Sequence, residues 1–373
     1  MDPQRKTLPG PMAPSTSMKT SHKSFAVTNT YTKSTKKEIV SVHTSTPTVE
    51  NKSINLEENQ VYQGEVNVLS IIDTNKDIMC CQYTEDFNEI AAGFTDGTMR
   101  VFSCNTGSCM HTLVDEECRA YPGPVTAIKH RPVSKANPIT NMLLSYVNGC
   151  IKCWKYKYDQ CLYTIREKRQ TLGLNYHPRY SKFVTYGDDA KLNMYDEEAQ
   201  TQERAFYSSQ QKNTTDGHTS RIFACAFNPR SQHEMISGGW DNTVMCWDDR
   251  QPYATRYFVG VHICGEGLDF DKPGRQILTC SWQEKDCIQL WDYGSCKLIE
   301  TIVPDNFQTK LYCGKMVPHT NLIVCGGSDS NILRVVDTNL KKATGSYKKI
   351  SELPNVPRVS FVTGKRLQTV DFG

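Results

Sequence analysis

From about Gly64 to the C-terminus, hydrophobic residues come in short runs separated by turns rich in Gly, Asp, Asn and Pro. Short apolar runs bounded by turn-forming residues predict many β-strands. The first 55 residues are instead rich in Ser, Thr, Pro and Lys and poor in large apolar side chains. Because such a segment cannot offset the entropy of ordering by burial, we expect a disordered tail over residues 1–55 and a folded all-β domain over residues 56–373.

A repeated unit organises the folded part. The segment FACAFNPRSQHEMISGGWDNTVMCWDDR contains one apolar run, a second that ends in a turn, and a third that ends in Trp-Asp. Five other segments follow the same plan, and the equivalent third-run positions are Phe102, Trp154, Tyr195, Trp247, Trp291 and Val336. Their spacing is close to the period of roughly 40–45 residues of a four-stranded propeller blade, with the surplus in loops. Six blades are therefore predicted.

A seventh unit is divided between the two ends of the domain. The C-terminal segment NVPRVSFVTGKRLQTVDFG supplies two strand-like runs and then stops, whereas residues 59–73, NQVYQGEVNVLSIID, supply two more. Pairing these segments would close a ring and leave no long open sheet edge. We expect a seven-bladed β-propeller that is closed by its N- and C-terminal strands and preceded by a disordered basic tail.

These units resemble the WD-repeat β-propeller family over about residues 60–373. In that family a His before the first strand, a Ser or Thr in the second, an Asp in the following turn and a Trp in the third form a hydrogen-bonded set. The fourth unit matches best, with His218, Ser237, Asp241 and Trp247. A buried carboxylate requires hydrogen-bond donors, and an imidazole can supply one. The third, fifth and sixth units depart from the pattern, in Tyr195, in the enlarged turn SWQEKDC and in Val336.

A catalytic interpretation of this Ser, His and Asp is disfavoured, because no nucleophile elbow or oxyanion motif accompanies them. The chain carries no other motif with a reaction mechanism behind it. We therefore predict that it is not an enzyme and has no catalytic residue, cofactor or small-molecule substrate.

Three further features have structural explanations. Cys150 and Cys153 have metal-like spacing, but residues three apart on a strand point to opposite faces, so no metal site is predicted. Gly238 and Gly239, and likewise Gly326 and Gly327, belong to no complete phosphate-binding motif, and we expect them in turns. Asp196, Glu197 and Glu198 form an acidic stretch that we expect to be a solvated loop between strands.

The family resemblance implies that partners bind at one end of the ring, where first strands begin and second strands end. Aligning the first strands on CAFNP, LNYHP and KMVP, and adding the residues before the turns, selects Arg221, Phe223, Gln170, Leu172, Lys310, Tyr312, Trp240 and Asp188. Because aromatic and Arg side chains are favoured interface anchors, the best hot-spot candidates are Arg221, Phe223, Trp240 and Tyr312. Alternatively, Phe223 fills the channel and Trp240 packs on a neighbouring loop.

Charge is distributed unevenly along the chain. The formal net charge is +3, but the first 37 residues contain seven Lys or Arg and a single acid, Asp2. The tail is therefore strongly basic and the domain slightly acidic. Lys33, Lys36 and Lys37 form the densest basic group, and we expect them to contact an acidic partner.

The opening MDPQRKTLPG lacks the apolar run of a signal peptide, and no stretch approaches 18 apolar residues. We accordingly expect a cytoplasmic protein with reduced thiols and no membrane partner. The predicted function is a scaffold for other proteins. A second hypothesis is a structural protein of the cytoskeleton or cilium axoneme whose tail binds tubulin, because VHICGEGLDFDKPGRQILTCSW is similar to runs in WD-repeat proteins of ciliated and flagellated organisms. A nucleic-acid adaptor is a third hypothesis, disfavoured because Arg is nearly absent from the tail.

Overall fold

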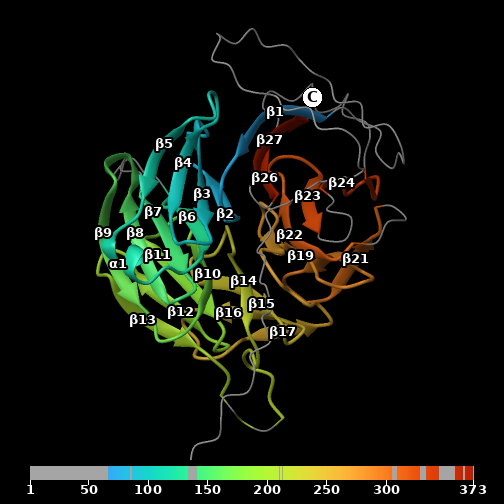
Figure 1. Ribbon diagram of the computed structural model, residues 1–373. Helices are drawn as coiled ribbons and strands as arrows, with labels where there is room; N and C mark the ends of the chain where they lie inside the picture. Colours follow the sequence, from blue (N-terminus) through green and yellow to red (C-terminus); the bar gives the residue numbers. More distant parts are fainter. Residues whose placement is uncertain are drawn as a thin grey trace, which may run out of the picture.

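The computed structural model describes residues 66–372, apart from residues 85, 133–140, 210, 212, 305–308, 328–332, 344–357 and 364–365. In this part of the chain the β-sheets follow one another around a central axis (Figure 1). One short helix, α1 (Glu116–Ala120), and one 3-10 turn, Tyr156–Tyr158, interrupt the strands. The predicted all-β propeller is confirmed. The predicted tail, with Lys33, Lys36 and Lys37, lies outside the described residues.

Six sheets have four strands each, and we number them as blades 1 to 6 in chain order. Blade 1 comprises β2 (Ile78–Tyr83), β3 (Glu89–Phe94), β4 (Met99–Ser103) and β5 (Cys109–Leu113). Blade 2 comprises β6 (Val125–His130), β7 (Met142–Tyr146), β8 (Cys150–Lys155) and β9 (Gln160–Arg166). Blade 3 comprises β10 (Thr171–Tyr176), β11 (Lys182–Gly187), β12 (Leu192–Asp196) and β13 (Thr201–Phe206).

The other three blades follow the same order. Blade 4 comprises β14 (Ile222–Phe227), β15 (Glu234–Gly239), β16 (Thr243–Asp248) and β17 (Arg256–Val259). Blade 5 comprises β18 (Leu268–Phe270), β19 (Gln276–Cys280), β20 (Ile288–Asp292) and β21 (Leu298–Ile302). Blade 6 comprises β22 (Leu311–Met316), β23 (Leu322–Gly327), β24 (Leu333–Asp337) and β25 (Lys342–Ala343).

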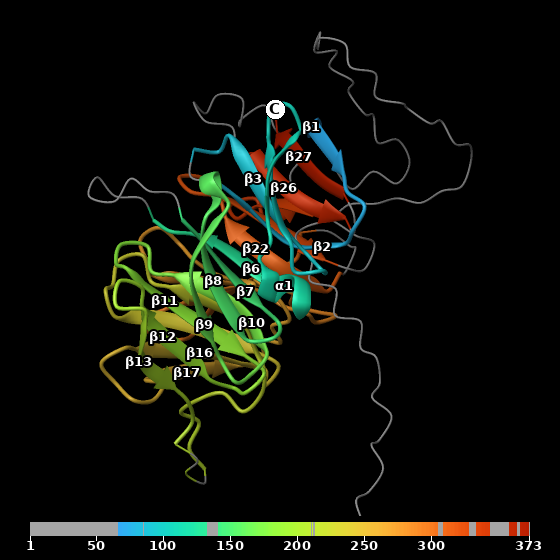
Figure 2. The same cartoon turned by 60° about the vertical axis from the view of Figure 1, so that its left-hand side comes forward.

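The two ends of the domain share a three-stranded terminal sheet in the order β1 (Val66–Asp73), β27 (Arg366–Phe372), β26 (Arg358–Thr363). β1 pairs antiparallel with β27, from Val66 opposite Phe372 to Asp73 opposite Arg366. Blue β1 lies beside red β27 in both views of the ribbon (Figures 1 and 2).

The expectation of a complete seventh blade was wrong for the described residues, which show six four-stranded blades and this smaller sheet. The described part of the N-terminal segment, from Val66 on, contributes one strand there, because VNVLSIID is one continuous run without a turn residue inside it.

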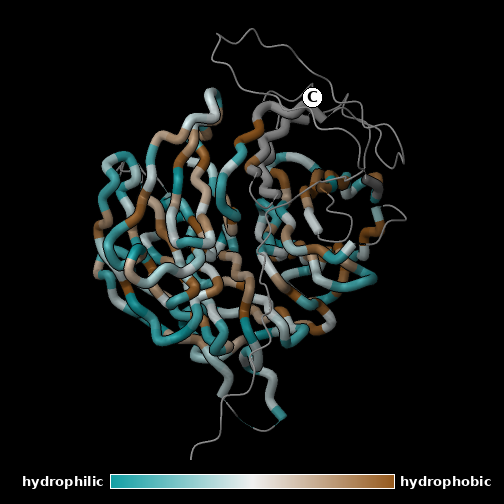
Figure 3. Tube along the Cα trace, viewed as in Figure 1, coloured by the Kyte–Doolittle hydropathy of each residue, from teal (hydrophilic) through white to brown (hydrophobic). Residues whose placement is uncertain are grey.

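The hydrophobic core lies between the blades, in layers that each join two neighbours. One cluster packs Val101 of blade 1 against Leu144 of blade 2, and similar clusters join the blades in order up to blades 5 and 6. Ile72 and Leu367 of the terminal sheet pack on blade 1. Figure 3 shows hydrophobic positions distributed around the whole ring. The six predicted third-strand positions are all buried, as interblade packing requires.

Ring closure generates the first prediction. Deleting residues 358–372 removes β26 and β27 and leaves β1 without its partner strand, so we expect an aggregated product or a broad, non-cooperative melting curve. Size-exclusion chromatography and thermal melting measure the result, with deletion of residues 1–55 as the control that should melt like the parent. A monomeric truncation that melts cooperatively near the parent temperature would contradict closure by the termini.

Candidate protein-binding face

At one end of the ring, the start of each blade's innermost strand lies beside the end of the second strand. In blade 4, Ile222 pairs with Gly239 and Ala224 with Gly238, so Phe223 is the extra residue of a β-bulge. The same register shift makes Leu172 the bulge residue of blade 3 and Tyr312 the bulge residue of blade 6. A bulge re-aims a side chain locally, and here it does so at the three sequence-selected positions in these strands.

The glycines that were expected in turns lie in strands and permit this arrangement. Gly239 ends β15, and a Cβ there would collide with the carbonyl oxygen of Arg221. Gly327 and Gly187 stand in the same relation to Lys310 and Gln170. The turn expectation was wrong for Gly238, Gly239, Gly326 and Gly327, which all lie in β15 or β23. Gly239 and Gly327 are required by close backbone approach, whereas a Cβ on Gly238 would collide with the side chains of Ile263 and Leu268.

The first aromatic group of this face is built between blades 4 and 5. Phe223 and Trp240 stack with ring centroids 5.3 Å apart, and Trp240 stacks on His262 at 6.3 Å. The Trp240 indole donates a hydrogen bond to Cys264 Sγ (3.2 Å), and the Arg221 guanidinium lies 5.3 Å from the Trp240 ring centroid. Arg221, Phe223, Trp240 and His262 are all half-buried, so part of the surface of each residue remains accessible to a partner.

A second aromatic group continues the face between blades 5 and 6. Trp282 and Tyr312 lie with ring centroids 4.1 Å apart, and the Lys310 ammonium lies 5.7 Å from the Trp282 ring centroid. The Trp282 backbone N–H donates to the His262 carbonyl (2.8 Å), which joins this group to the first. We call Phe223, Trp240, His262, Trp282 and Tyr312 the aromatic row; it carries one cation near each end.

The structure therefore brings together five of the eight residues selected from sequence. Arg221, Phe223 and Trp240 form the first group, and Lys310 and Tyr312 belong to the second. Gln170 and Asp188 lie at the same end of blade 3, where the Gln170 backbone N–H donates to Asp188 Oδ1 (3.0 Å), and Leu172 is half-buried beside them. The alternative prediction was that Trp240 packs on a neighbouring loop. Its ring does stack on His262 in the linker to blade 5, but it is only half-buried.

Sequence reasoning missed Trp282 and His262. Trp282 follows the second strand of blade 5 as Trp240 follows that of blade 4. The repeat pattern could therefore have identified Trp282 as a residue of the binding face. Its enlarged turn, SWQEKDC, obscured the equivalence. His262 lies in the linker between blades and has no repeat position. Burial lowers the pKa of His262, with the charge of Asp241 acting in the opposite direction.

Beneath the face, blade 4 contains a buried hydrogen-bond network. His218 Nδ1 lies 2.8 Å from Asp241 Oδ2, and His218 Nε2 lies 2.7 Å from Ser237 Oγ. The Trp247 indole donates to the same Ser237 oxygen (2.7 Å). Burial would raise the pKa of Asp241, but hydrogen bonds from His218 and from neighbouring Thr residues outweigh it and hold the pKa below its ordinary value. The Ser hydroxyl is enclosed and saturated, which suits a structural element and not a nucleophile.

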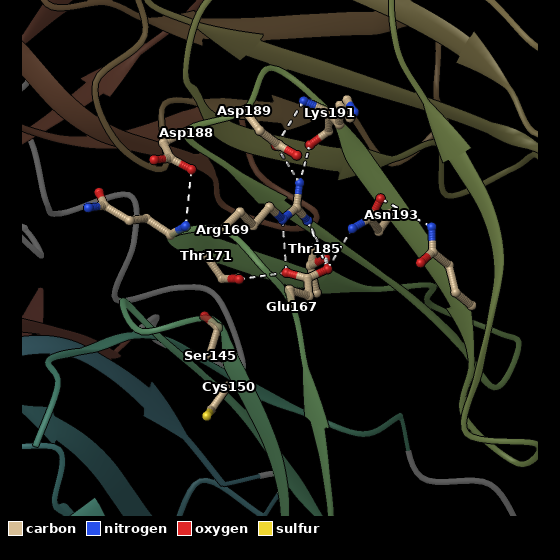
Figure 4. A network of polar contacts seen from close by, with 12 residues as sticks. Ser145, Cys150, Glu167, Arg169, Thr171, Thr185, Asp188, Asp189, Lys191 and Asn193 are labelled. Atoms are coloured by element: carbon tan, nitrogen blue, oxygen red, sulfur yellow. Dashed lines mark hydrogen bonds and ion pairs between the residues drawn. The ribbon is translucent and has the colours of Figure 1, made fainter. Parts of the chain in front are cut away.

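Blade 3 replaces this network with a buried ion pair, shown in Figure 4. Glu167 accepts two bonds from Arg169 (2.9 and 3.0 Å) and further bonds from Thr171, Thr185, Asn193 and Tyr195. The Arg169 guanidinium also reaches Asp189 (2.8 Å). Burial would raise the pKa of Glu167, but the charge of Arg169 and these hydrogen bonds lower it. A tyrosine can therefore occupy the Trp position here, because its hydroxyl reaches a carboxylate that blade 4 lacks.

The central channel is bridged by charged side chains. Lys129 of blade 2 reaches Glu266, at the entry to blade 5, over 2.7 Å, and Lys315 of blade 6 lies 3.5 Å from Asp269. The cavity beside this bridge measures about 10 Å³, room for roughly one water molecule. A cavity of this size cannot hold an organic substrate.

Two negative findings concern only the described residues. In that part of the chain no group of three His, Cys, Asp or Glu side chains is placed to hold a metal ion, and no helix is long and apolar enough to cross a membrane. Cys150 and Cys153 belong to different core clusters on opposite sides of blade 2.

The blade 3 ion pair generates a stability prediction. Glu167→Gln removes the more deeply buried of the two carboxylates that pair with Arg169, and breaking such a buried pair costs about 3 kcal/mol or more. The matched control is Glu203→Gln, because Glu203 pairs with Lys182 (2.9 Å) at a partly exposed site where about 1 kcal/mol or less is at stake. Denaturant unfolding monitored by fluorescence compares the two variants. Equal losses in both would contradict a special role for Glu167.

The blade 4 network generates a pH prediction. Asp241→Ala leaves donors without their acceptor and should cost about 1–3 kcal/mol near neutral pH. The pKa of Asp241 is lower in the folded state than in the unfolded state, where it is about 3.9. Its stabilising contribution is therefore complete well above pH 3.9 and is lost as the pH falls from there through the folded-state pKa. The stability difference between parent and variant should therefore shrink on acidification from pH 6. An unfolding difference that stays constant down to pH 3 would contradict this account.

Comparison with known proteins agrees with this architecture. The model of the WD domain, G-beta repeat, matches residues 209–248, the range that contains the blade 4 network. The Cilia- and flagella-associated protein 52 of Chlamydomonas reinhardtii is 24% identical over 268 residues, 61% of this chain and 41% of that protein. The Ribosome biogenesis protein WDR12 homolog of Anopheles gambiae is 27% identical over 132 residues, 35% of this chain and 27% of that protein.

The Periodic tryptophan protein 2 of Arabidopsis thaliana is 24% identical over 174 residues, 46% of this chain and 17% of that protein. The chain thus spans less than half the length of each of these relatives. The described residues of this chain repeat one four-stranded antiparallel unit six times. Residues 209–248 thus form a WD repeat, and the described residues have the β-propeller fold that the resemblance to the WD-repeat family predicts.

Proposed function

We propose that this protein is a non-catalytic scaffold that holds a partner protein on the aromatic row. The observation that supports this most directly is the joining of two half-buried aromatic groups, each beside a cation, by the hydrogen bond from Trp282 to His262. Aromatic rings and guanidinium groups dominate the binding energy of protein interfaces. The enclosed Ser237 and the small channel cavity argue against an active site in either place.

The chemistry of the row favours a particular kind of partner segment. The stacked rings are already held by their neighbours, so little side-chain entropy is lost on binding. Rings packed in this way offer flat apolar surface to Pro, aliphatic or aromatic side chains. Arg221 lies over Trp240, and Lys310 lies over Trp282 with Glu284 3.9 Å away; both cations would favour carboxylates of a partner. We propose an extended apolar segment flanked by acidic residues.

Pull-down from cell extract tests the proposal. The double variant Arg221→Glu and Trp282→Ala should reduce recovery of bound proteins at least about tenfold, because it removes an anchor from each group and reverses one charge. Tyr257→Ala is the matched control, since Tyr257 is an exposed aromatic residue on β17, and it should recover partners like the parent. Both variants should melt near the parent temperature. Undiminished recovery by the double variant would place the interface elsewhere.

The second candidate is a structural protein of cilia, whose basic tail binds tubulin while the propeller holds another component. It is favoured by the similarity to a cilia- and flagella-associated protein, whereas the similarity to a ribosome biogenesis protein points to a different cellular process. Residues 1–55 fused to a reporter should cosediment with microtubules at low salt and be released at high salt, because exposed charges are screened over about 8 Å at physiological ionic strength. A reporter that stays in the supernatant at every salt concentration would contradict tubulin binding, and the scaffold proposal would then stand without it.

A further inference from the structure

Two cysteines from different blades face each other away from the aromatic row. Cys246 lies in β16 of blade 4 and is completely buried, whereas Cys296 lies in the turn between β20 and β21 of blade 5 and is half-buried. Their sulfur atoms are 3.8 Å apart although 50 residues separate them in the chain. All sixteen cysteines are free, and this pair joins a half-buried cysteine to a completely buried one.

The local structure does not require a cysteine at either end of the pair. Cys296 takes the left-handed backbone conformation (φ 56°) four residues after its strand ends. The equivalent turn positions are Gly107 in blade 1, Gln200 in blade 3 and Lys341 in blade 6, so the turn accepts very different side chains. Cys246 immediately precedes Trp247, at a position that Val101 fills in blade 1. Hydrophobic packing alone would therefore be satisfied by residues other than cysteine.

The surroundings favour reaction at Cys296. Arg256 is the residue paired with Cys246 across β16 and β17, and its guanidinium donates to the backbone carbonyls of Tyr293 and Gly294 in the turn that contains Cys296. The hydrogen bond with Cys246 lowers the pKa of the Cys296 thiol, partial burial opposes this, and the charge of Arg256 adds to the lowering. A partly exposed cysteine beside a cation reacts with peroxide as its thiolate.

We propose that Cys296 and Cys246 form a redox site in which hydrogen peroxide oxidises Cys296 and Cys246 resolves the product as a disulfide between blades 4 and 5. The Cys296 thiolate attacks one peroxide oxygen, the O–O bond breaks, and the departing hydroxide takes a proton to become water, which leaves a sulfenic acid. The Cys246 sulfur then attacks the Cys296 sulfur, the S–O bond breaks, and the Cys246 proton leaves with the hydroxide as a second water. Two electrons pass from the two thiols to the peroxide.

The disulfide would link β16 to the β20–β21 turn and close a loop across the junction of blades 4 and 5. The same junction supports the aromatic row, because Trp240 comes from blade 4 and stacks on His262 in the linker to blade 5. Oxidation would thus fix the relative position of the two blades that present the first aromatic group.

Peptide mapping of the reduced full chain after brief treatment with hydrogen peroxide tests the proposal. The expected product is a Cys246–Cys296 linked peptide, formed at least about tenfold faster than oxidation of Cys109, the exposed control cysteine on β5. In Cys246→Ser, the Cys296 sulfenic acid should persist and react with dimedone. In Cys296→Ser, no linked peptide should form and Cys246 should remain reduced.

Two results would overturn the proposal. The first is that Cys296 is oxidised no faster than Cys109. The second is that the parent chain forms disulfides among many cysteines without preference for the Cys246–Cys296 pair. Melting curves of the two reduced Ser variants separate chemistry from misfolding, because both should remain cooperative. If Cys246→Ser destabilises the buried site, Cys246→Ala supplies the same chemical test without adding a hydroxyl to the core.

Discussion

The antiparallel pairing of β1 with β27 is the constraint on which the ring depends. Each blade buries its two faces against neighbours, so blade 1 needs a partner on the side where the chain begins. That partner is the terminal sheet, where Ile72 from one end of the domain and Leu367 from the other pack on blade 1. Residues almost 300 positions apart thus complete one hydrophobic layer, and the local blades alone could not do so.

Once the blades are fixed, the binding face follows from two backbone devices. A bulge after the first residue of the innermost strand directs Phe223 and Tyr312 to the rim, and a glycine at the end of the second strand lets the chain approach closely enough to hold Arg221 and Lys310 there. The buried networks below bind the strands together with polar contacts. Phe223 and Tyr312 are consequently positioned by strands, and Trp240, His262 and Trp282 are held by stacking and hydrogen bonds, which lowers the entropy lost on binding.

The sequence predicted what repeats and missed what does not. Trp154, Trp247 and Trp291 mark third strands because the same interblade layer recurs, and a periodic pattern reveals it. Glu197 was expected in solvent, yet its carboxylate is buried 2.9 Å from Arg131 Nε of blade 2. Nothing in the local sequence announces a partner 66 residues away, since the ion pair depends on how two blades meet.

The candidate site divides in the same way. Arg221, Phe223 and Trp240 were found because they occupy repeat positions, whereas His262 lies in a linker and was not. The enlarged turn after β19 concealed Trp282, although the strand before it is regular. The seventh blade was overestimated because two apolar runs were read in a segment whose described part forms a single strand. Tertiary contacts, and not strand propensity, decide each of these cases.

The central claim is that the aromatic row touches the partner. Site-specific photocrosslinking measures this contact directly: Trp282 is replaced by p-benzoylphenylalanine in the full chain, and Tyr257, on the outer strand of blade 4, is replaced in a matched protein. On irradiation in cell extract, the account predicts a discrete crosslinked species from position 282 whose partner peptide is apolar with flanking acidic residues, and none from position 257. Crosslinking from position 257 with none from position 282 would contradict the account.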